Sequence, residues 1–405
     1  MLPSRTRTRG CVVSCFFVVT AAACGSTGVA QPPGAIAPGA LATPVASTPP
    51  PSMPDTPSPT PACTTGGRLA TWTLDRLAAQ TIVVPVDERN VGAVRAEVSA
   101  GVGGVILFGT TAPGDLAAQL QSLNAAAPSG ISRIVMTDEE GGAVQRMANV
   151  VGSIPSAREM GASMSPVQIE QIAQRLATRM RAAGVTMDLA PVLDVDGGAG
   201  PNNRNADGTR SFSADETVAS RDGRAFAAGL AAGGIDAAVK HFPGLGQATG
   251  NTDVTPASTV SWSRLLSHGL LPFADAVGAH ASAVMVANAT VPGLSTVPAS
   301  ISATVIQGVL RGELAFQGLV VTDSLSTPAL QAIGYSVPRA AVAALHAGAD
   351  MVLFNADASS VASVTTQIIA AITSAVGRGA LARRTVEGAV AHVLATKHVD
   401  LCAPA

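Results

Sequence analysis

Acidic and basic side chains stand at the ends of short apolar runs along this chain, and their types suit a hydroxyl-rich ligand. Asp138 ends the run IVMTD, Lys240 and His241 lie near the end of IDAAVKHF, and Asp323 ends GLVVTD. A carboxylate facing a polyhydroxylated ligand indicates glycoside chemistry, which requires a nucleophile and a proton donor. We expect Asp323 to stay ionised beside Lys240 or Arg210, because nearby positive charge favours the carboxylate.

Motifs of other reaction classes are absent from the sequence. It has no G-x-S-x-G elbow, no P-loop and no histidine pair at zinc spacing. We therefore expect neither a metal nor another cofactor. The residues that we expect to converge on a neutral ligand are Asp138, Arg146, Arg210, Lys240 and His241.

Eight apolar runs must position these side chains, and amphipathic Ala-rich stretches lie between most of them. The runs span residues 81–86, 104–108, 134–138, 185–194, 235–242, 282–288, 318–323 and 349–354. Nearly continuous apolar runs are typical of parallel strands that are buried on both faces. The pattern predicts an α/β fold, a single (β/α)₈ TIM-type barrel. An open doubly wound sheet is the alternative, although no G-x-G-x-x-G follows an early strand.

Polar residues follow the ends of five of these runs, where a barrel carries its catalytic face. They are Asp138, Asp194, the pair Lys240–His241, Asn288 and Asp323. Any one of them alone could be a helix cap or a satisfied core group. Polar residues at the equivalent ends of five runs favour a functional site at this face of the barrel.

The chain begins with a segment typical of export. Residues 1–23 combine a basic start with the apolar run CVVSCFFVVTAAA, which predicts a signal peptide with a lipobox. Cys24 would then carry the lipid, with Ala21 where a leucine is usual; the alternative is an ordinary signal peptide. Residues 24–62 are a Pro-rich linker and residues 63–405 the barrel domain. We expect a protein anchored to the outer face of the cytoplasmic membrane, in the cell envelope.

Cysteine and charge content add two expectations. Cys63 and Cys402 stand at the two ends of the expected domain, so an exported protein could join them in a disulfide; two free thiols are the alternative. The net charge of −2 gives no electrostatic reason to expect nucleic acid as a partner. We expect a monomer.

Several longer motifs resemble those of the family 3 glycoside hydrolases. They are IVMTDEEGGAVQRM, GTRSFSADETV, VKHFPGLG, GELAFQGLVVTDSLS and ALHAGADMVL, in the family's order between about residues 70 and 400. The chain is most similar to single-barrel bacterial β-N-acetylglucosaminidases that act on peptidoglycan or muropeptide-type glycans. The resemblance implies that Asp323 is the nucleophile. It also implies that Asp138, Arg146, Arg210, Lys240 and His241 bind the sugar.

The chain departs from the family pattern after VKHFPGLG. Well-known members read KHFPGHG, then four residues, then Asp-Ser-His, whose histidine is the acid/base. Counted without gaps, Asp253 falls on that histidine, Leu245 on an earlier one, and Asn288 replaces another at the sixth strand. Either Asp253 is itself the acid/base, or it is a turn residue and the protein binds glycans without turnover. A third interpretation keeps the enzyme but assigns another β-hexoside, such as a β-glucoside.

Overall fold

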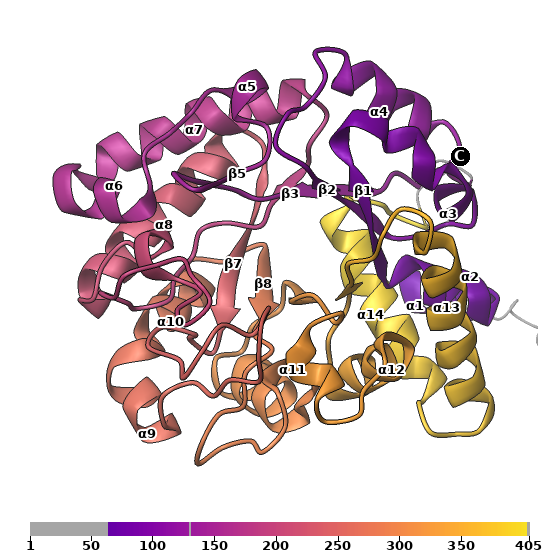
Figure 1. The fold of residues 1–405 in the computed structure, drawn as a ribbon. Helices are drawn as coiled ribbons and strands as arrows, with labels where there is room; N and C mark the ends of the chain where they lie inside the picture. Colours follow the sequence, from indigo (N-terminus) through magenta and orange to yellow (C-terminus); the bar gives the residue numbers. More distant parts are fainter. Residues whose placement is uncertain (1–63, 129–130, 403–405) are drawn as a thin grey trace, which may run out of the picture. The chain divides into compact units, whose positions relative to one another are not determined.

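The computed structural model describes residues 64–128 and 131–402, so the expected signal peptide, lipobox and linker lie outside the described residues. Within this part, eight parallel strands form one sheet in the order β10-β1-β2-β3-β6-β7-β8-β9. A parallel bridge between Val321 and Met351 joins the two edge strands. The sheet thereby closes into a barrel, and helices surround it (Figure 1). The predicted (β/α)₈ barrel is confirmed, and the open doubly wound sheet is excluded.

Each of the eight expected runs contains one barrel strand. The strands are β1 (Ile82–Asp87), β2 (Gly104–Phe108), β3 (Ile134–Thr137), β6 (Met187–Asp188), β7 (Asp236–Phe242), β8 (Ala283–Val286), β9 (Leu319–Thr322) and β10 (Val352–Leu353). The run 185–194 differs most, because only two of its residues are in a strand. Pro191 lacks the N–H that a longer strand would need. A small antiparallel pair, β4 (Glu139–Gly141) with β5 (Val144–Gln145), follows β3 and is too polar for the apolar pattern to predict.

Helices and short helical turns fill the connections between strands. They are α1 (Thr65–Leu69), α2 (Leu74–Gln80), η1 (Glu88–Val94), α3 (Arg95–Ser99), α4 (Leu116–Asn124), α5 (Ala148–Val151), α6 (Ala157–Ser163), α7 (Pro166–Ala182), η2 (Gly208–Arg210), α8 (Glu216–Ala232), α9 (Trp262–Arg264), η3 (Leu265–Gly269), α10 (Leu271–Gly278), η4 (Ala299–Ile301), η5 (Thr304–Glu313), α11 (Pro328–Gln331), α12 (Val337–Ala347), α13 (Val361–Gly377) and α14 (Arg383–Thr396). None of the helices in the described part is long and apolar enough to cross a membrane.

Alternation along the strands divides the core into two layers. In β1, Val83 faces the barrel interior while Val84 packs outward against the helices. Successive side chains of a strand point to opposite faces, so an apolar run fills both layers at once. The interior layer includes Met136, Met285 and Met351, whose flexible side chains fill the barrel below the site.

The longest helix pair shows why the sequence folds as it does. Ser165 caps α7 in a reciprocal capping box with Gln168, and Pro166 occupies its first turn. On α8, a Cβ added at Gly229 would lie 2.2 Å from the carbonyl oxygen of Glu170. Glycine is therefore required there for α8 to approach α7 closely.

Cys402 is disulfide-bonded, which agrees with its expected role. Its expected partner, Cys63, lies outside the described residues, so the particular pairing stays a prediction.

Peptide mapping of the non-reduced protein should recover one disulfide-linked species that contains both Cys63 and Cys402. Reduction should split it into two peptides whose masses sum to that of the linked species plus two hydrogens. A linkage of Cys402 to any other cysteine would refute the predicted pair.

Candidate active site

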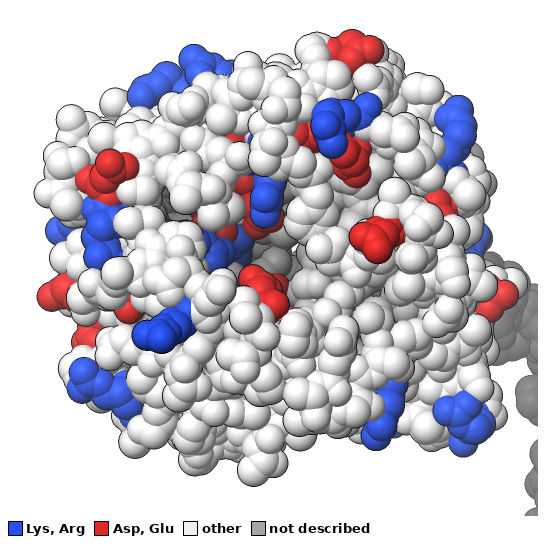
Figure 2. All heavy atoms as spheres, viewed as in Figure 1, with Lys and Arg blue, Asp and Glu red and all other residues white. Residues whose placement is uncertain are grey.

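The carboxyl ends of the barrel strands surround an open cavity of about 780 Å³. Its floor is the top of the apolar barrel interior, including Ile106, Met285 and Leu353. Charged side chains line its walls, and Figure 2 shows them around a central hollow on this face. The volume is in the range of small-molecule sites, and the face is the one where TIM barrels carry their chemistry.

This pocket brings together every catalytic and sugar-binding residue expected from the sequence. The seven are Asp138, Arg146, Arg210, Lys240, His241, Asp253 and Asp323. They come from the ends of β3, β7 and β9 and from the connections that follow β5, β6 and β7.

A buried ion network forms one wall of the pocket. The Nζ of Lys240 lies 2.7 Å from the Oδ1 of Asp138 and 2.6 Å from the Oε1 of Glu140. The guanidinium of Arg210 donates to both oxygens of Glu140, each at 2.7 Å. Two-pronged contacts of this kind fix the plane of the guanidinium as well as its position. The network thus joins β3, β7 and the loop that carries Arg210.

Charge pairing decides the protonation of this wall. Burial acts to raise the pKa of Glu140, but Arg210 and Lys240 outweigh it and lower that pKa well below its usual range. Burial likewise acts to lower the pKa of Lys240, and the carboxylates of Asp138 and Glu140 raise it instead. Glu140 and Lys240 are therefore charged at neutral pH, and this wall presents a fixed array of donors and acceptors to a ligand.

Arg158 of α6 holds the loop that delivers Arg210. Its Nη2 donates to the carbonyl oxygens of Asp196 at 2.5 Å and Gly208 at 2.8 Å, and its Nε donates to that of Ser211 at 3.2 Å. One side chain therefore satisfies three loop carbonyls, which fixes the backbone on both sides of Arg210.

Glu139 supports the opposite edge of the wall. Its carboxylate accepts hydrogen bonds from the backbone N–H groups of Arg146 and Met147, each at 2.7 Å, and from Gln145 at 2.9 Å. Burial nevertheless raises the pKa of Glu139 to about 7. These contacts hold the β4–β5 hairpin so that the guanidinium of Arg146 lies 3.7 Å from Asp138.

His241 is oriented from below by Asp194. The Oδ2 of Asp194 lies 2.6 Å from the Nδ1 of His241, and its Oδ1 accepts the backbone N–H of Leu245 at 2.6 Å. Burial lowers the pKa of His241, and the charge of Arg210 adds to the effect. The ring is therefore neutral, donates its Nδ1–H to Asp194 and leaves Nε2 free to accept a hydrogen bond from a ligand hydroxyl.

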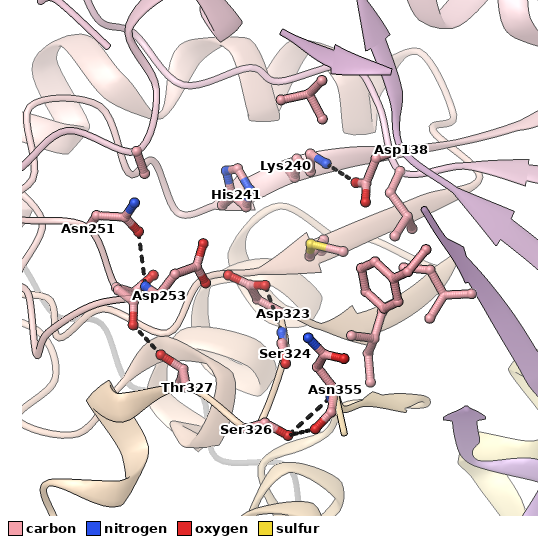
Figure 3. Close-up of a pocket in the computed structure, with 18 of the residues that line it drawn as sticks. Asp138, Lys240, His241, Asn251, Asp253, Asp323, Ser324, Ser326, Thr327 and Asn355 are labelled. Carbon is pink, nitrogen blue, oxygen red and sulfur yellow. Dashed lines mark hydrogen bonds and ion pairs between the residues drawn. The ribbon is translucent and has the colours of Figure 1, made fainter. Parts of the chain in front are cut away.

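Asp323 lies at the end of β9, and Figure 3 shows its carboxylate pointing toward that of Asp253. Burial raises its pKa, and the charge of Asp253 raises it further, although His241 and Lys240 act in the opposite direction. The expectation that nearby cations would dominate is therefore wrong. Lys240 is already paired with Asp138 and Glu140, and the ring of His241 is neutral, so little positive charge remains to stabilise the Asp323 carboxylate.

The loop that carries Asp253 is anchored on both sides. The Oδ1 of Asn251 accepts the backbone N–H of Asp253 at 2.9 Å, and its Nδ2 donates to the carbonyl oxygen of Asn202 at 3.2 Å. The hydroxyl of Thr327, four residues after Asp323, donates to the carbonyl oxygen of Thr252. Asp253 is indeed in an Asx-turn, but the turn presents its carboxylate to the pocket (Figure 3).

Asn288, which is also at a strand end, does not line the pocket. It is buried, its Nδ2 donates to the carbonyl oxygen of Ser324 at 2.7 Å, and its Oδ1 accepts the hydroxyl of Ser300 at 2.6 Å. It is thus a satisfied core group that supports the backbone beside Asp323.

A buried cluster of Asp194, Asp207 and His241 lies beneath the pocket, and its ligand atoms lie within 4.8 Å of one another. Such a set could hold a divalent cation, but Asp194 already accepts N–H donors on both oxygens, and Arg210 adds positive charge. Within the described residues, neither oxygen of Asp207 has a hydrogen-bond donor. Burial raises the pKa of Asp207 well above its usual value, and the charge of Asp194 adds to the effect. A proton on Asp207, shared with Asp194, fits this cluster better than a metal.

Glu140 and Asp207 are the functional residues that sequence reasoning missed. Glu140 directly follows Asp138 and Glu139. Three adjacent acidic residues in TDEEGG could have indicated that more than one carboxylate lies at the end of this strand. Asp207 stands in a polar loop, and no periodicity marks it as buried.

A parallel barrel whose mouth places facing carboxylates beside a wall of charged donors and acceptors has the groups that a glycoside hydrolase uses. The sequence model of the glycosyl hydrolase family 3 N terminal domain matches residues 73–396, and the chain belongs to this family.

Relatives and solved structures give the same assignment. A beta-hexosaminidase of Xylella fastidiosa (strain 9a5c) is 35% identical over 294 residues, which cover 69% of this chain and 85% of that protein. The structure of the beta-N-acetylhexosaminidase from Beutenbergia cavernae DSM 12333 is 32% identical, with a TM-score of 0.74, and the match covers 82% of this chain and 100% of that one. M tuberculosis LpqI is 28% identical, with a TM-score of 0.73 and coverages of 83% and 97%.

The protonated state of Asp207 predicts a pH-dependent effect of Asp207→Asn. An aspartate ionises near pH 3.9 when unfolded, whereas folded Asp207 keeps its proton to much higher pH. Its contribution to stability is therefore complete below about pH 4 and is lost as the pH rises toward the raised pKa. Asparagine keeps a donor to Asp194 and has no such loss. In urea unfolding at pH 5, 6 and 7, the free energy of unfolding of Asp207→Asn should increase relative to that of the wild type by up to about 1.4 kcal/mol per pH unit.

Asp207→Ala is the matched comparison. It also removes the titration, but it takes away the donor that residue 207 offers to Asp194. The free energy of unfolding of Asp207→Ala should therefore be lower than that of Asp207→Asn by roughly 1–3 kcal/mol at each pH. Parallel pH curves for the wild type and Asp207→Asn would contradict a proton on Asp207.

Proposed function

We propose that this protein is a retaining β-N-acetylhexosaminidase that removes terminal β-linked N-acetylglucosamine from peptidoglycan-derived glycans. The observation that carries the proposal is the facing pair Asp323 and Asp253 at the mouth of the barrel (Figure 3). A retaining mechanism needs two carboxyl groups on one glycosidic bond, one as nucleophile and one as acid/base.

Asp323 is the nucleophile in this mechanism, and Asp253 is the first proton donor. Repulsion from the neighbouring carboxylate of Asp253, together with burial, raises the pKa of Asp323. The proposed reaction starts from the state in which Asp253 carries the proton and Asp323 is ionised. As the carboxylate of Asp323 attacks the anomeric carbon, Asp253 gives its proton to the departing glycosidic oxygen. Asp253 is the more exposed of the two carboxyl groups.

The second half of the reaction reverses the role of Asp253. Once Asp323 is esterified to the sugar, its negative charge is gone and the repulsion ends. Asp253 can then remain ionised and take a proton from the attacking water. Hydrolysis of the ester regenerates the Asp323 carboxylate and releases the sugar with its original anomeric configuration.

The ion network would bind the sugar hydroxyls. Lys240 directs two N–H groups to Asp138 and Glu140, which leaves a third for a ligand. Asp138 and the Nε2 of His241 provide acceptors, while Arg146 and Arg210 provide donors. A hydroxyl both donates and accepts, so mixed walls of this kind suit a neutral sugar.

The proposed location follows from the first 62 residues. A lipid on Cys24 and a Pro-rich spacer would hold the barrel at the outer face of the cytoplasmic membrane, where peptidoglycan and its fragments are available. Neither the lipid nor the substrate follows from the barrel itself.

A second candidate function is binding without turnover, because the usual acid/base histidine is replaced by Asp253. A β-glucosidase is the third candidate, since preference for an N-acetyl group depends on details of pocket shape. Both are outcomes of the experiment below.

The purified protein should release 4-nitrophenol from the N-acetyl-β-glucosaminide with a higher kcat/KM than from the β-glucoside. Asp323→Asn keeps the size of the side chain but removes the nucleophile, so it should lower kcat by roughly 10³-fold or more. Binding without turnover predicts no release from either compound. A reversed preference would indicate a β-glucosidase, and full activity in Asp323→Asn would refute its role.

Asp253→Asn should distinguish an acid from a turn residue. Asparagine preserves the Asx-turn but cannot donate a proton to the leaving oxygen. We expect a loss of roughly 10²–10⁴-fold on an alkyl N-acetyl-β-glucosaminide, and a far smaller loss of the glycosylation rate on the 4-nitrophenyl compound, whose leaving group needs no proton. Asn251→Ala, which loosens the turn but keeps the acid, is the control. Equal losses on both compounds in Asp253→Asn would count against an acid role.

A further inference from the structure

The segment that carries Asp253 has little packing of its own. Residues 253–256 are four consecutive exposed positions, and the buried Thr252 directly precedes them. The apolar side chain of Val254 is 48% exposed. Side-chain burial within residues 253–256 therefore does not fix the position of Asp253, which depends on the contacts of its neighbours.

Thr327 provides such a contact from the segment of the nucleophile. It is buried, and its hydroxyl donates to the carbonyl oxygen of Thr252 (Figure 3). The same hydroxyl accepts the backbone N–H of Ala329 at 3.3 Å, in the first turn of α11. One side chain thus joins the residue before Asp253 to the helix that follows Asp323.

Residues 323–327 are themselves held firmly by their surroundings. The Nδ2 of Asn288 donates to the carbonyl oxygen of Ser324 at 2.7 Å. The hydroxyl of Ser326 donates to the carbonyl oxygen of Asn355 at 2.5 Å and accepts its backbone N–H at 3.0 Å. A contact from this segment therefore fixes the loop of Asp253 relative to the nucleophile itself.

We propose that Thr327 is a positioning residue that holds the carboxyl group of Asp253 where it can protonate the leaving oxygen of a glycoside attacked by Asp323. The proposal rests on the proposed glycosidase activity and deepens it. A general acid must lie within hydrogen-bond reach of the atom that it protonates, and a misplacement of about 1 Å can cost roughly 10²-fold in rate. Thr327 acts through the backbone of Thr252 and takes no part in the proton transfer.

Thr327→Val tests this role, because valine has nearly the shape of threonine but cannot donate to Thr252. On an alkyl N-acetyl-β-glucosaminide, whose leaving oxygen needs the proton, kcat/KM should fall by roughly 10- to 100-fold. On the 4-nitrophenyl compound, whose leaving group needs no proton, kcat/KM should fall by less than about threefold. Thr327→Ser keeps the hydroxyl and should retain wild-type values on both compounds.

Thr259→Val is the matched control in the same connection. Thr259 and Thr327 are each 3% exposed, and the hydroxyl of Thr259 donates to the adjacent carbonyl oxygen of Val260 at 2.7 Å. This variant loses a comparable buried hydrogen bond that does not reach the nucleophile, so kcat/KM should change equally on both compounds. Equal losses on both compounds in Thr327→Val, or a selective loss in Thr259→Val, would overturn the positioning role.

Hydrogen exchange separates the contact from the activity. The backbone N–H groups of Asp253, Val254 and Thr255 donate to Asn251, and in Thr327→Val they should exchange at least about tenfold faster than in the wild type. Unchanged exchange would overturn the proposal even in an active enzyme. Faster exchange, in a protein whose wild type hydrolyses neither compound, would support Thr327 as the anchor of this loop and refute the glycosidase. Thr327→Ala also lacks the hydroxyl and replaces Thr327→Val if that variant does not fold.

Discussion

The active site depends on the pairing of one buried carboxylate, Glu140, with two buried cations, Lys240 and Arg210. Three charges taken out of water are stable only as a complete set, and removal of one partner from such a set costs about 3–5 kcal/mol. The network therefore sets the relative positions of β3, β7 and the loop held by Arg158. Because Asp138 and Glu140 already neutralise its cations, the network leaves little positive charge to stabilise the Asp323 carboxylate. The pKa of Asp323 is then raised mainly by burial and by the charge of Asp253.

The loop after β7 fixes the position of its acidic group through backbone contacts. The carbonyl oxygen of Thr252 accepts from Thr327, and the side chain of Asn251 bridges to Asn202. Neither contact involves the side chain of Asp253. The backbone can thus present residue 253 to Asp323 whatever that side chain is. This position can therefore accept a carboxyl in place of the histidine that the family pattern predicts.

The sequence was sufficient for the barrel, because eight apolar runs bounded by polar residues leave few other arrangements for a parallel sheet. It also located the pocket residues, since strand-end positions such as Asp138 and Asp323 meet at one face. It failed where partners come from distant segments. The direction of the pKa shift of Asp323 depends on which carboxylates neutralise Lys240, and the burial of Asp207 depends on how a polar loop folds under His241. Asn288 shows the same limit, because its strand-end position says nothing of its bonds to Ser324 and Ser300.

The apolar floor formed by Ile106, Met285 and Leu353 has a kinetic consequence. The barrel below it is filled with side chains, so the pocket is a dead end and not a tunnel. In the proposed reaction, a released monosaccharide would leave through the opening by which the next substrate enters. Accumulated product would then compete with substrate for the same space, and the glycan would be released after each cleavage.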